Sequence, residues 1–292
     1  MTSTLLEFWL ARGDRLPDAV PGDEALLREV LSFDGPVAAA ALTRQLDVGD
    51  AGDRLWLRAD PAWLRADMTT VRMFAHGNLG LSCDEIAALT PDLVKLFATY
   101  DMVFDAPTTA RWYVACPATL SIPDFPDPDR ALGDDLRLHA LTGSEGKFWR
   151  VLGNDIQVLL HNHPVNQARV AKGAAPVNGL WLWGGGRLPS VVSSNVDGYF
   201  GDDPTAMALA AAASLPTFAL DAFSKSVNAP NAIVDLRSLR GDALTAALDG
   251  FAASDLGNGK TVINLAFSSG ERYRYKPSHR RRFWRRTQST QR

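Results

Sequence analysis

The strongest constraint on the fold is the alternation of helical and strand patterns in the second half of the chain. Residues 144–162 place Leu152, Ile156 and Leu160 on one side of a helix, and the apolar residues 177–183 follow as a strand. Strands that alternate with helices usually form a sheet covered by those helices, so this order predicts an α/β fold. The alternation continues in helices over 164–172, 204–215 and 242–253 and strands over 232–236, 261–267 and 272–275.

The first half of the chain predicts a helical N-terminal section followed by strands. Residues 1–50 carry apolar side chains at helical spacing, and two strand patterns, at 54–58 and 68–74, are expected to pair. Ser82, with Glu85 three residues later, has the spacing of a capping box that opens a helix. Two more strands are expected at 102–105 and 111–115.

The predicted organisation follows from a segment rich in proline and charge at residues 122–130, which is typical of a linker or long loop. We expect an N-terminal helical and strand section over residues 1–120, the linker over 121–131 and an α/β section over 132–292. One continuous domain is the alternative. The sheet is expected to be mixed or mostly parallel and flanked by helices.

The cysteine content and the N-terminus favour a cytoplasmic protein. Cys83 and Cys116 are the two cysteines of the sequence, too few for a disulfide framework or a cysteine-based zinc site. The first ten residues lack a basic and apolar signal pattern, and the Ala-rich residues 204–220 are too weakly hydrophobic to span a bilayer. We therefore expect no membrane partner, and Cys116 is expected to be a small core residue.

Candidate ligand-binding residues are concentrated in 29 residues of the second half. Glycines after a strand let a backbone approach a ligand, and arginines can donate paired hydrogen bonds to phosphate or carboxylate. The stretch therefore predicts a site for a small anionic metabolite. Its candidate residues are His161, His163, Asn166, Arg169, Asn178, Gly184, Gly185, Gly186 and Arg187.

The same residues also have a structural interpretation. His163 precedes Pro164 and can cap a helix, Asn178 can pin a loop, and the glycines can simply form a tight turn. The Asp residues of Asp60-Pro61 and Asp202-Asp203-Pro204 are likewise expected to be caps and turn formers rather than catalytic groups.

Two resemblances bear on these residues. The run HPVNQARVAKGAAPVNGLWLWGGGRLP resembles the part of archaeal-type cofactor-independent phosphoglycerate mutases that reads H-P-V-N-x-x-R, a spacer, P-A-N and a strand ending in G-x-G. Those enzymes belong to the alkaline phosphatase superfamily, so the resemblance implies a reduced alkaline-phosphatase-like fold. Trp181–Gly186 and Phe283–Arg286 resemble features of a bacterial regulatory family named for regulation of pathogenicity factors, type E, and that resemblance extends over most of the chain.

The chain departs from the mutase resemblance in its metal ligands. The mutases hold two divalent metals with Asp and His ligands beside a Ser nucleophile. None of the five histidines (His76, His139, His161, His163, His279) lies in an Asp-His pair or an H-x-x-x-D motif. We therefore expect neither a catalytic residue nor a metal site, and Mn²⁺ or Mg²⁺ only under an enzymatic interpretation.

These observations favour a regulatory protein that binds a small phosphorylated or carboxylated metabolite without metal-dependent catalysis. The alternative is a phosphoglycerate mutase- or phosphatase-like enzyme. A further alternative starts from the charge distribution: residues 271–292 carry +8, whereas the other 270 residues carry −11. Residues 272–286 interleave aromatics with arginines, which suits nucleic-acid or protein contact. We favour instead a terminal helix that docks Phe283 and Trp284.

Overall fold

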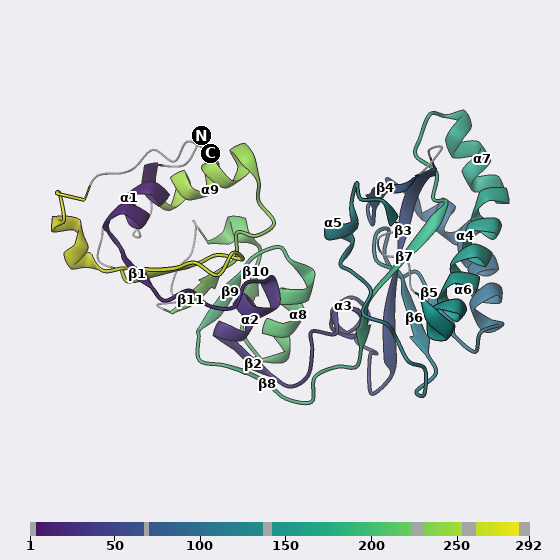
Figure 1. Ribbon diagram of the computed structural model, residues 1–292, viewed down its shortest axis with the longest axis horizontal. Coiled ribbons are helices and arrows are strands. Elements are labelled where there is room, and N and C mark those ends of the chain that lie inside the picture. Colours follow the sequence, from purple (N-terminus) through teal and green to yellow (C-terminus); the bar gives the residue numbers. More distant parts are fainter. Residues whose placement is uncertain (1–3, 67–69, 137–141, 224–230, 253–260, 286–292) are drawn as a thin grey trace. The chain divides into compact units, whose positions relative to one another are not determined.

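The computed structural model shows a mixed α/β protein whose contacts divide the chain into two units (Figure 1). Unit 2 is the continuous segment Gly35–Pro189, and unit 1 combines Met1–Asp34 with Ser190–Arg292. Unit 2 is therefore an insertion in the sequence of unit 1. The structure describes residues 4–66, 70–136, 142–223, 231–252 and 261–285.

This division differs from the predicted sections 1–120 and 132–292. Strand β7 (Gly179–Gly186) follows residues 121–131 in the chain, but it pairs along β3 (Leu55–Ala66), which precedes them. Residues 121–131 contain the short helix α5 and lie inside unit 2. Because the sheet contains strands from before and after residues 121–131, these residues lie within one unit and do not separate two domains.

Unit 2 is built on a five-stranded sheet that is antiparallel throughout. Strand β3 pairs antiparallel with β4, β6 and β7, and β5 pairs antiparallel with β6. The pairing of the strands predicted at 54–58 and 68–74 is confirmed, although residues 68 and 69 lie outside the described residues. A mostly parallel sheet is not confirmed, because β3 is long enough to pair with three antiparallel partners. The remaining strands are β4 (Val71–His76), β5 (Val103–Asp105) and β6 (Tyr113–Cys116).

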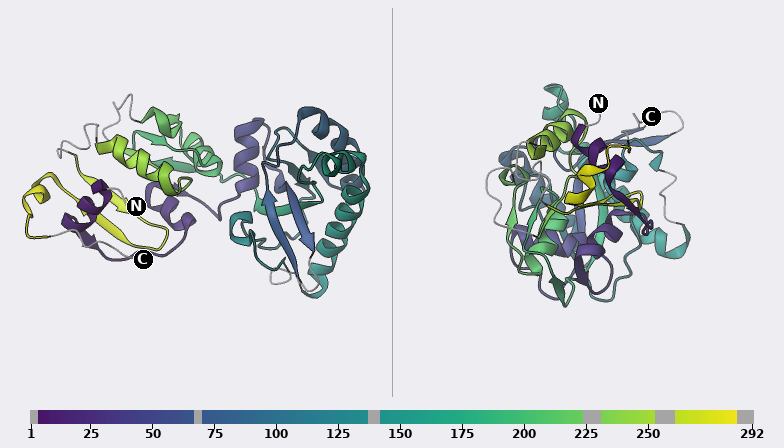
Figure 2. Two further views of the ribbon diagram at one scale, coloured as in Figure 1. Left: turned by 90° about the horizontal axis from the view of Figure 1, so that it is seen from above. Right: turned by 90° about the vertical axis from the view of Figure 1, so that its left-hand side faces the viewer.

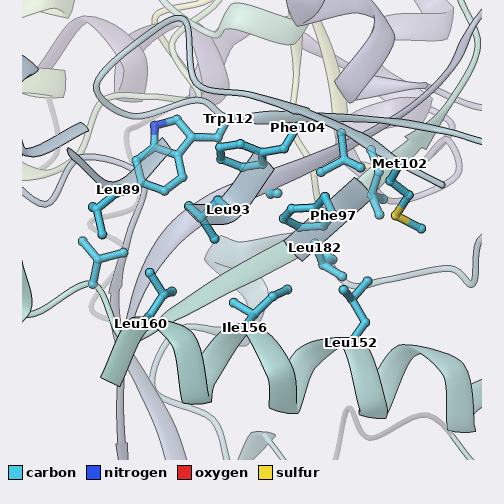
Figure 3. Packing of buried hydrophobic residues seen from close by; sticks show 14 of the residues in the cluster. Leu89, Leu93, Phe97, Met102, Phe104, Trp112, Leu152, Ile156, Leu160 and Leu182 are labelled. Carbon is cyan, nitrogen blue, oxygen red and sulfur yellow. The ribbon is translucent and has the colours of Figure 1, made fainter. Parts of the chain in front are cut away.

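Helices cover both faces of this sheet, with α3 on one side and α6 on the other (Figure 2). Side chains along a strand alternate between faces, so Leu57 joins the core under α4 and α6 while Trp56 joins the core under α3. Figure 3 shows Leu152, Ile156 and Leu160 pointing from α6 towards Leu182 of β7. The helices of unit 2 are α3 (Ala39–Asp47), α4 (Cys83–Ala98), α5 (Pro128–Ala131), α6 (Gly143–Asn162) and α7 (Pro164–Ala171).

Local sequence signals set the ends of two of these helices. The capping box is confirmed at α4: Ser82 Oγ accepts from the Glu85 amide at 3.2 Å, and Glu85 Oε2 accepts from the Ser82 amide at 2.9 Å. At α7, Pro164 occupies the first turn, and Gly173, with φ of +73°, follows the end of the helix.

Unit 1 contains three small sheets with helices packed on them. Strands β10, β9 and β11 are parallel, whereas β1-β13-β12 and β2-β8 are antiparallel. Trp9, Phe200, Phe223, Phe251 and Tyr275 form much of its core. The helices are α1 (Thr4–Arg12), α2 (Asp23–Val30), α8 (Pro204–Ala212) and α9 (Gly241–Ala252), with 3-10 turns η2 (Leu220–Ala222) and η3 (Pro277–Arg281). The strands are β1 (Asp14–Leu16), β2 (Leu31–Phe33), β8 (Val192–Ser194), β9 (Gly198–Phe200), β10 (Thr217–Phe218), β11 (Ala232–Val234), β12 (Ile263–Ala266) and β13 (Arg272–Tyr275).

The N-terminal section is helical only in part, because β1 and β2 interrupt it. Each has three residues and pairs with a strand from the other end of the chain, a contact that local periodicity does not reveal. In the ranges that the structure describes, no helix has the length and apolar character needed to cross a membrane.

Candidate functional site

Two asparagines of the predicted ligand site lie inside unit 2 and bond to its backbone. Asn166 is buried on α7; its Nδ2 donates to the carbonyls of Leu160 and Val177 at 2.7 and 2.6 Å, and its Oδ1 accepts from the Val177 amide at 2.8 Å. Asn178 Nδ2 donates to the Leu64 carbonyl, and Asn178 Oδ1 accepts from the Leu64 amide, both at 2.7 Å. Asn166 therefore ties the residues that lead into β7 to helices α6 and α7, and Asn178, directly before β7, ties the same segment to β3.

Arg169 is buried on the same helix and is surrounded by acceptors. Its Nη2 donates to the Leu79 carbonyl at 2.6 Å, its Nε donates to the Ala175 carbonyl at 2.8 Å, and its Nη1 lies 2.8 Å from Glu85 Oε2. Glu85 belongs to the capping box of α4, so the ion pair joins the beginning of α4 to the last turn of α7. Arg169 and the capping box form one structural cluster.

The glycine run lets α3 approach β7. A Cβ on Gly184 would lie 2.9 Å from Ala39 Cβ, and one on Gly186 would lie 2.6 Å from Ala38 Cβ. Both glycines also have positive φ values, +63° and +153°. A Cβ on Gly185 would lie 2.7 Å from Ile122 Cγ2. The run thus supplies close packing for the strand.

Arg187 and the two histidines lie at the edges of this region. Arg187 is exposed, and its guanidinium donates to the backbone carbonyls of Asp53 and Ala118. His163 Nδ1 accepts from the Val165 amide at 3.2 Å and so caps α7, whereas His161 is exposed on α6. The structure therefore places Asn166, Arg169 and His163 together around α7 and leaves His161 and Arg187 apart from them.

A second polar cluster lies on the α3 side of the unit 2 sheet and was not predicted. Asp60 is 2% exposed in the middle of β3, and it accepts from Arg58 at 2.9 and 2.8 Å and from Trp183 Nε1 at 2.7 Å. The expectation that Asp60 forms a turn or cap is therefore wrong, because β3 continues through Pro61. Burial raises the pKa of Asp60, against the opposing effects of Arg58 and Trp183.

Further side-chain hydrogen bonds extend this second polar cluster. Arg58 Nη1 donates to Thr43 Oγ1 at 3.2 Å, and Asp47 accepts from Tyr113 Oη at 2.5 Å and from Arg111 Nη2 at 2.6 Å. A buried network with each member bonded holds a fold in one arrangement. Arg58 lies in β3 and Arg111 in the loop before β6, so only the tertiary structure identifies them.

A third cluster lies at the carboxyl edge of the parallel sheet in unit 1, where α/β proteins commonly bind ligands. Asp203 follows β9 and Asp235 follows β11, so the parallel strands bring them to the same edge. Arg237 donates to both carboxylate oxygens of Asp235, through Nε at 2.9 Å and Nη2 at 2.6 Å. Tyr199 Oη donates to Asp235 Oδ2 at 2.7 Å.

Arg237 also faces two carboxylates that do not bond to it directly. Its Nη2 lies 3.8 Å from Asp203 Oδ1, and its Nη1 lies 3.7 Å from Asp23 Oδ2. Asp203 is the N-cap of α8 and accepts from the Ala206 amide at 2.7 Å, which confirms its predicted capping role. Because distances near 3.8 Å exceed hydrogen-bond range, some donor capacity of Arg237 remains for a ligand.

The two strand-end carboxyls of this third cluster have shifted pKa values in opposite directions. Burial raises the pKa of Asp203, and the nearby charge of Asp235 adds to the effect. Burial alone would raise the pKa of Asp235 as well, but the hydrogen bond and charge of Arg237 hold it below its usual range. In such a pair, Asp203 can exchange a proton while Asp235 stays ionised beside it. The sequence analysis misses this pair, because Asp235 falls inside the strand expected at 232–236 and no strand is expected before Asp203, which is expected only to be a cap or turn former.

The metals implied by the mutase resemblance do not fit the described residues. Among those residues, no three His, Cys, Asp or Glu side chains are grouped so that they could hold a metal ion. At the carboxyl edge of unit 1, Arg237 already lies between Asp23, Asp203 and Asp235. His139 lies outside the described residues.

Comparisons with known proteins point to one enzyme name. The chain is 25% identical over 181 residues to a 2,3-bisphosphoglycerate-independent phosphoglycerate mutase from Methanosarcina mazei, a match that covers 60% of this chain and 44% of the relative. A probable mutase of the same name from Geobacter sulfurreducens is 33% identical over 66 residues, which cover 23% of this chain and 16% of the relative. The chain thus matches less than half the length of these relatives. No protein-family model matches the chain.

A cofactor-independent phosphoglycerate mutase from Thermoplasma acidophilum is a solved structure similar to this one, with a TM-score of 0.42 and 15% identity. The alignment covers 94% of this chain and 82% of that one. The sequence matches support the local resemblance to cofactor-independent phosphoglycerate mutases. They give no support to the resemblance to the regulatory family.

Proposed function

We propose that this protein acts on a small phosphorylated carboxylic acid by mutase- or phosphatase-type phosphoryl transfer. The observation that carries the proposal is the similarity of 60% of the chain to proteins named as phosphoglycerate mutases. A phosphoglycerate carries a phosphate and a carboxylate, two groups that arginine binds well. The proposal includes the fold implied by the resemblance, a reduced alkaline-phosphatase-like domain, for which unit 1 with its parallel strands is the candidate.

The site that we propose is the carboxyl edge of β9 and β11. Arg237, fixed by Asp235, has donor capacity for an anionic group of the substrate. Asp203, with its raised pKa, is the group best placed to exchange a proton beside it. These roles use side chains of the described residues, and no step depends on a metal.

The second candidate function is binding of the same kind of metabolite without turnover. The observation that favours it is the position of Arg237, whose charge already balances Asp23, Asp203 and Asp235. Such a protein would report the metabolite concentration, which is the regulatory role expected from the sequence.

Ligand binding at the predicted stretch 161–189 remains a separate proposal. Asn166 and Arg169 would have to exchange internal partners to bind a ligand, at the cost of unpaired buried groups. Arg187 is exposed, and its guanidinium donates to the backbone carbonyls of Asp53 and Ala118, which a ligand could replace at low cost. Arg187→Ala tests this site independently of unit 1.

The experiment combines binding and turnover on the full chain. Thermal unfolding with 3-phosphoglycerate, glycerol 3-phosphate and glycerate, each with and without Mn²⁺, shows whether phosphate and carboxylate are both needed. A ligand at a hundredfold excess over its Kd stabilises the native state by about 2.7 kcal/mol. Phosphorus NMR of the same mixtures detects transfer to the 2-position or release of inorganic phosphate.

Asp203→Asn is the informative variant because asparagine caps a helix about as well as aspartate but carries no charge. Asp127→Asn is the matched control, since Asp127 also caps a helix and also has a raised pKa, yet it lies in unit 2. Loss of turnover in Asp203→Asn alone supports the enzyme and its site. Binding without turnover selects the second candidate, and no response to 3-phosphoglycerate in either assay refutes both.

A further inference from the structure

The last described segment of the chain, Lys276–Arg285, combines exposed cations with two exposed aromatic rings. Phe283 and Trp284 are 78% and 67% exposed, the two highest values among the exposed aromatic residues of the described chain. We favoured a terminal helix that docks these rings, but the structure leaves both in solvent. An explanation by core packing therefore does not apply to them.

The segment is held in place on both sides of the rings. Arg282 Nη1 donates to Asp14 Oδ1 at 2.6 Å and to the Arg12 carbonyl at 3.0 Å. Arg285 Nη1 donates to the Gly13 carbonyl at 2.9 Å. Two arginines thus anchor the residues that flank Phe283 and Trp284 to the end of α1 and the start of β1, so the rings are presented by a fixed backbone.

The rings are oriented so that each can stack a flat partner. Their centroids are 5.3 Å apart and their planes make an angle of 80°, so the two faces point in different directions. Solvent-exposed aromatic side chains stack on unpaired bases. Such stacking tolerates any base, because each base has a flat face.

Positive charge surrounds the two rings. Arg280, Arg281 and Arg285 are exposed, and Lys276 is exposed at the start of the segment. Burial lowers the pKa of His279, and the charges of Arg282, Lys276 and Arg285 lower it further, whereas Asp14 acts in the opposite direction. The local field is thus positive, although the rest of the chain carries a net negative charge.

We propose that Lys276–Arg285 is a binding surface for single-stranded nucleic acid. The cations suit a phosphate backbone, and two adjacent, anchored and solvent-exposed rings suit two unpaired bases. A duplex has the same phosphates but keeps its bases stacked inside, so it should bind more weakly. The proposal is independent of the proposed phosphoryl-transfer function, because it involves none of the residues at the carboxyl edge of β9 and β11.

The test is fluorescence anisotropy of a labelled twenty-nucleotide oligothymidylate titrated with the full chain over a series of salt concentrations. Four phosphate contacts give a slope of log K against log salt of about −3, at roughly −0.7 for each contact. A duplex of equal length, inorganic polyphosphate and a polyglutamate peptide serve as competitors.

Two paired substitutions separate the contributions of the rings and the charges. Phe283→Ala with Trp284→Ala should weaken binding between about fivefold and a hundredfold for each ring, without changing the salt slope. Arg280→Gln with Arg281→Gln should make the slope shallower by roughly 1.4. Phe74→Ala and Arg130→Gln, at exposed positions of unit 2, are the matched controls and should change neither quantity.

Some outcomes overturn the proposal. These are no binding of the oligonucleotide at low salt, equal binding by single strand and duplex, or unchanged affinity after removal of both rings. Displacement of the oligonucleotide by polyglutamate at lower concentration than by polyphosphate would also overturn it, and would identify an acidic protein segment as the partner. Self-association of the chain that disappears when both rings are replaced would also overturn the proposal, and would identify a second copy of the chain as the partner.

Discussion

Replacement of Asn166 by alanine distinguishes a structural asparagine from a ligand-binding one. The side chain is 4% exposed and makes three hydrogen bonds to backbone groups, at 2.6 to 2.8 Å. Alanine removes all three and leaves the Val177 amide and two carbonyls to find other partners. At about 1 kcal/mol for each bond, the free energy of unfolding should fall by roughly 3 kcal/mol.

The loss should be measurable as a change in the thermal midpoint of unit 2. For a unit of this size, 1 kcal/mol corresponds to about 2–4 °C, so Asn166→Ala should lower the midpoint by roughly 6–12 °C. Tryptophan fluorescence follows this transition, because all tryptophans except Trp9 and Trp284 lie in unit 2.

Asn162→Ala is the control for this measurement. Asn162 is exposed, and its side-chain amide donates to the Val158 carbonyl of its own helix at 2.9 Å. Because alanine favours a helix more than asparagine does, the control should shift the midpoint by little or in the stabilising direction. If Asn166→Ala shifts the midpoint no more than Asn162→Ala does, the assignment of a structural role to Asn166 is wrong.

Three further predictions concern other parts of the molecule. Ser82→Ala should lower the free energy of unfolding by about 1 kcal/mol in urea titrations, since the Glu85 amide loses its cap; an unchanged value would show that the cap is dispensable. Cys83 is exposed, whereas burial raises the pKa of the Cys116 thiol to about 12. Native protein should therefore react with one equivalent of a thiol reagent, and unfolded protein with two. Rapid reaction of both thiols in the native state would contradict the burial of Cys116. The raised pKa of Asp203 means that its ionisation destabilises the fold as pH rises from the unfolded pKa towards the folded one. Asp203→Asn should therefore be more stable than the parent chain at pH 7, and this advantage should disappear at acidic pH near the ordinary value of 3.8; a variant less stable at pH 7 would show that the ionised form is favoured after all.

Local structure was largely encoded in local sequence. The helices that begin at Cys83 and Pro164 follow from capping residues, and the helix that begins at Gly143 follows from apolar spacing; both signals act within a few residues of the chain. The strands expected at 54–58, 68–74 and 111–115 coincide in part with β3, β4 and β6, although β3 continues to Ala66. Strands β1 and β2 were not expected, since three residues carry no periodicity and gain their structure only from distant partners.

The candidate sites depended more on the tertiary structure. The sequence identified the chemical types in residues 161–189 and also their structural alternative, and the structure shows internal hydrogen bonds for Asn166, Arg169 and Asn178. The sequence could not reveal that Asp60 is buried against Arg58, because an Asp-Pro pair is far more common in turns than in the middle of a strand.

The sequence by itself determined the α/β class, the positions of most helices and strands, and the contrast between a basic end and an acidic remainder. Only the tertiary structure decided that unit 2 is an insertion, that its sheet is antiparallel, and that Asp203, Asp235 and Arg237 meet at one edge. The physical reason is the range of the forces involved. Caps and side-chain periodicity act over one or two turns, whereas strand pairing and ion-pair formation join residues whose separation in the chain carries no signal.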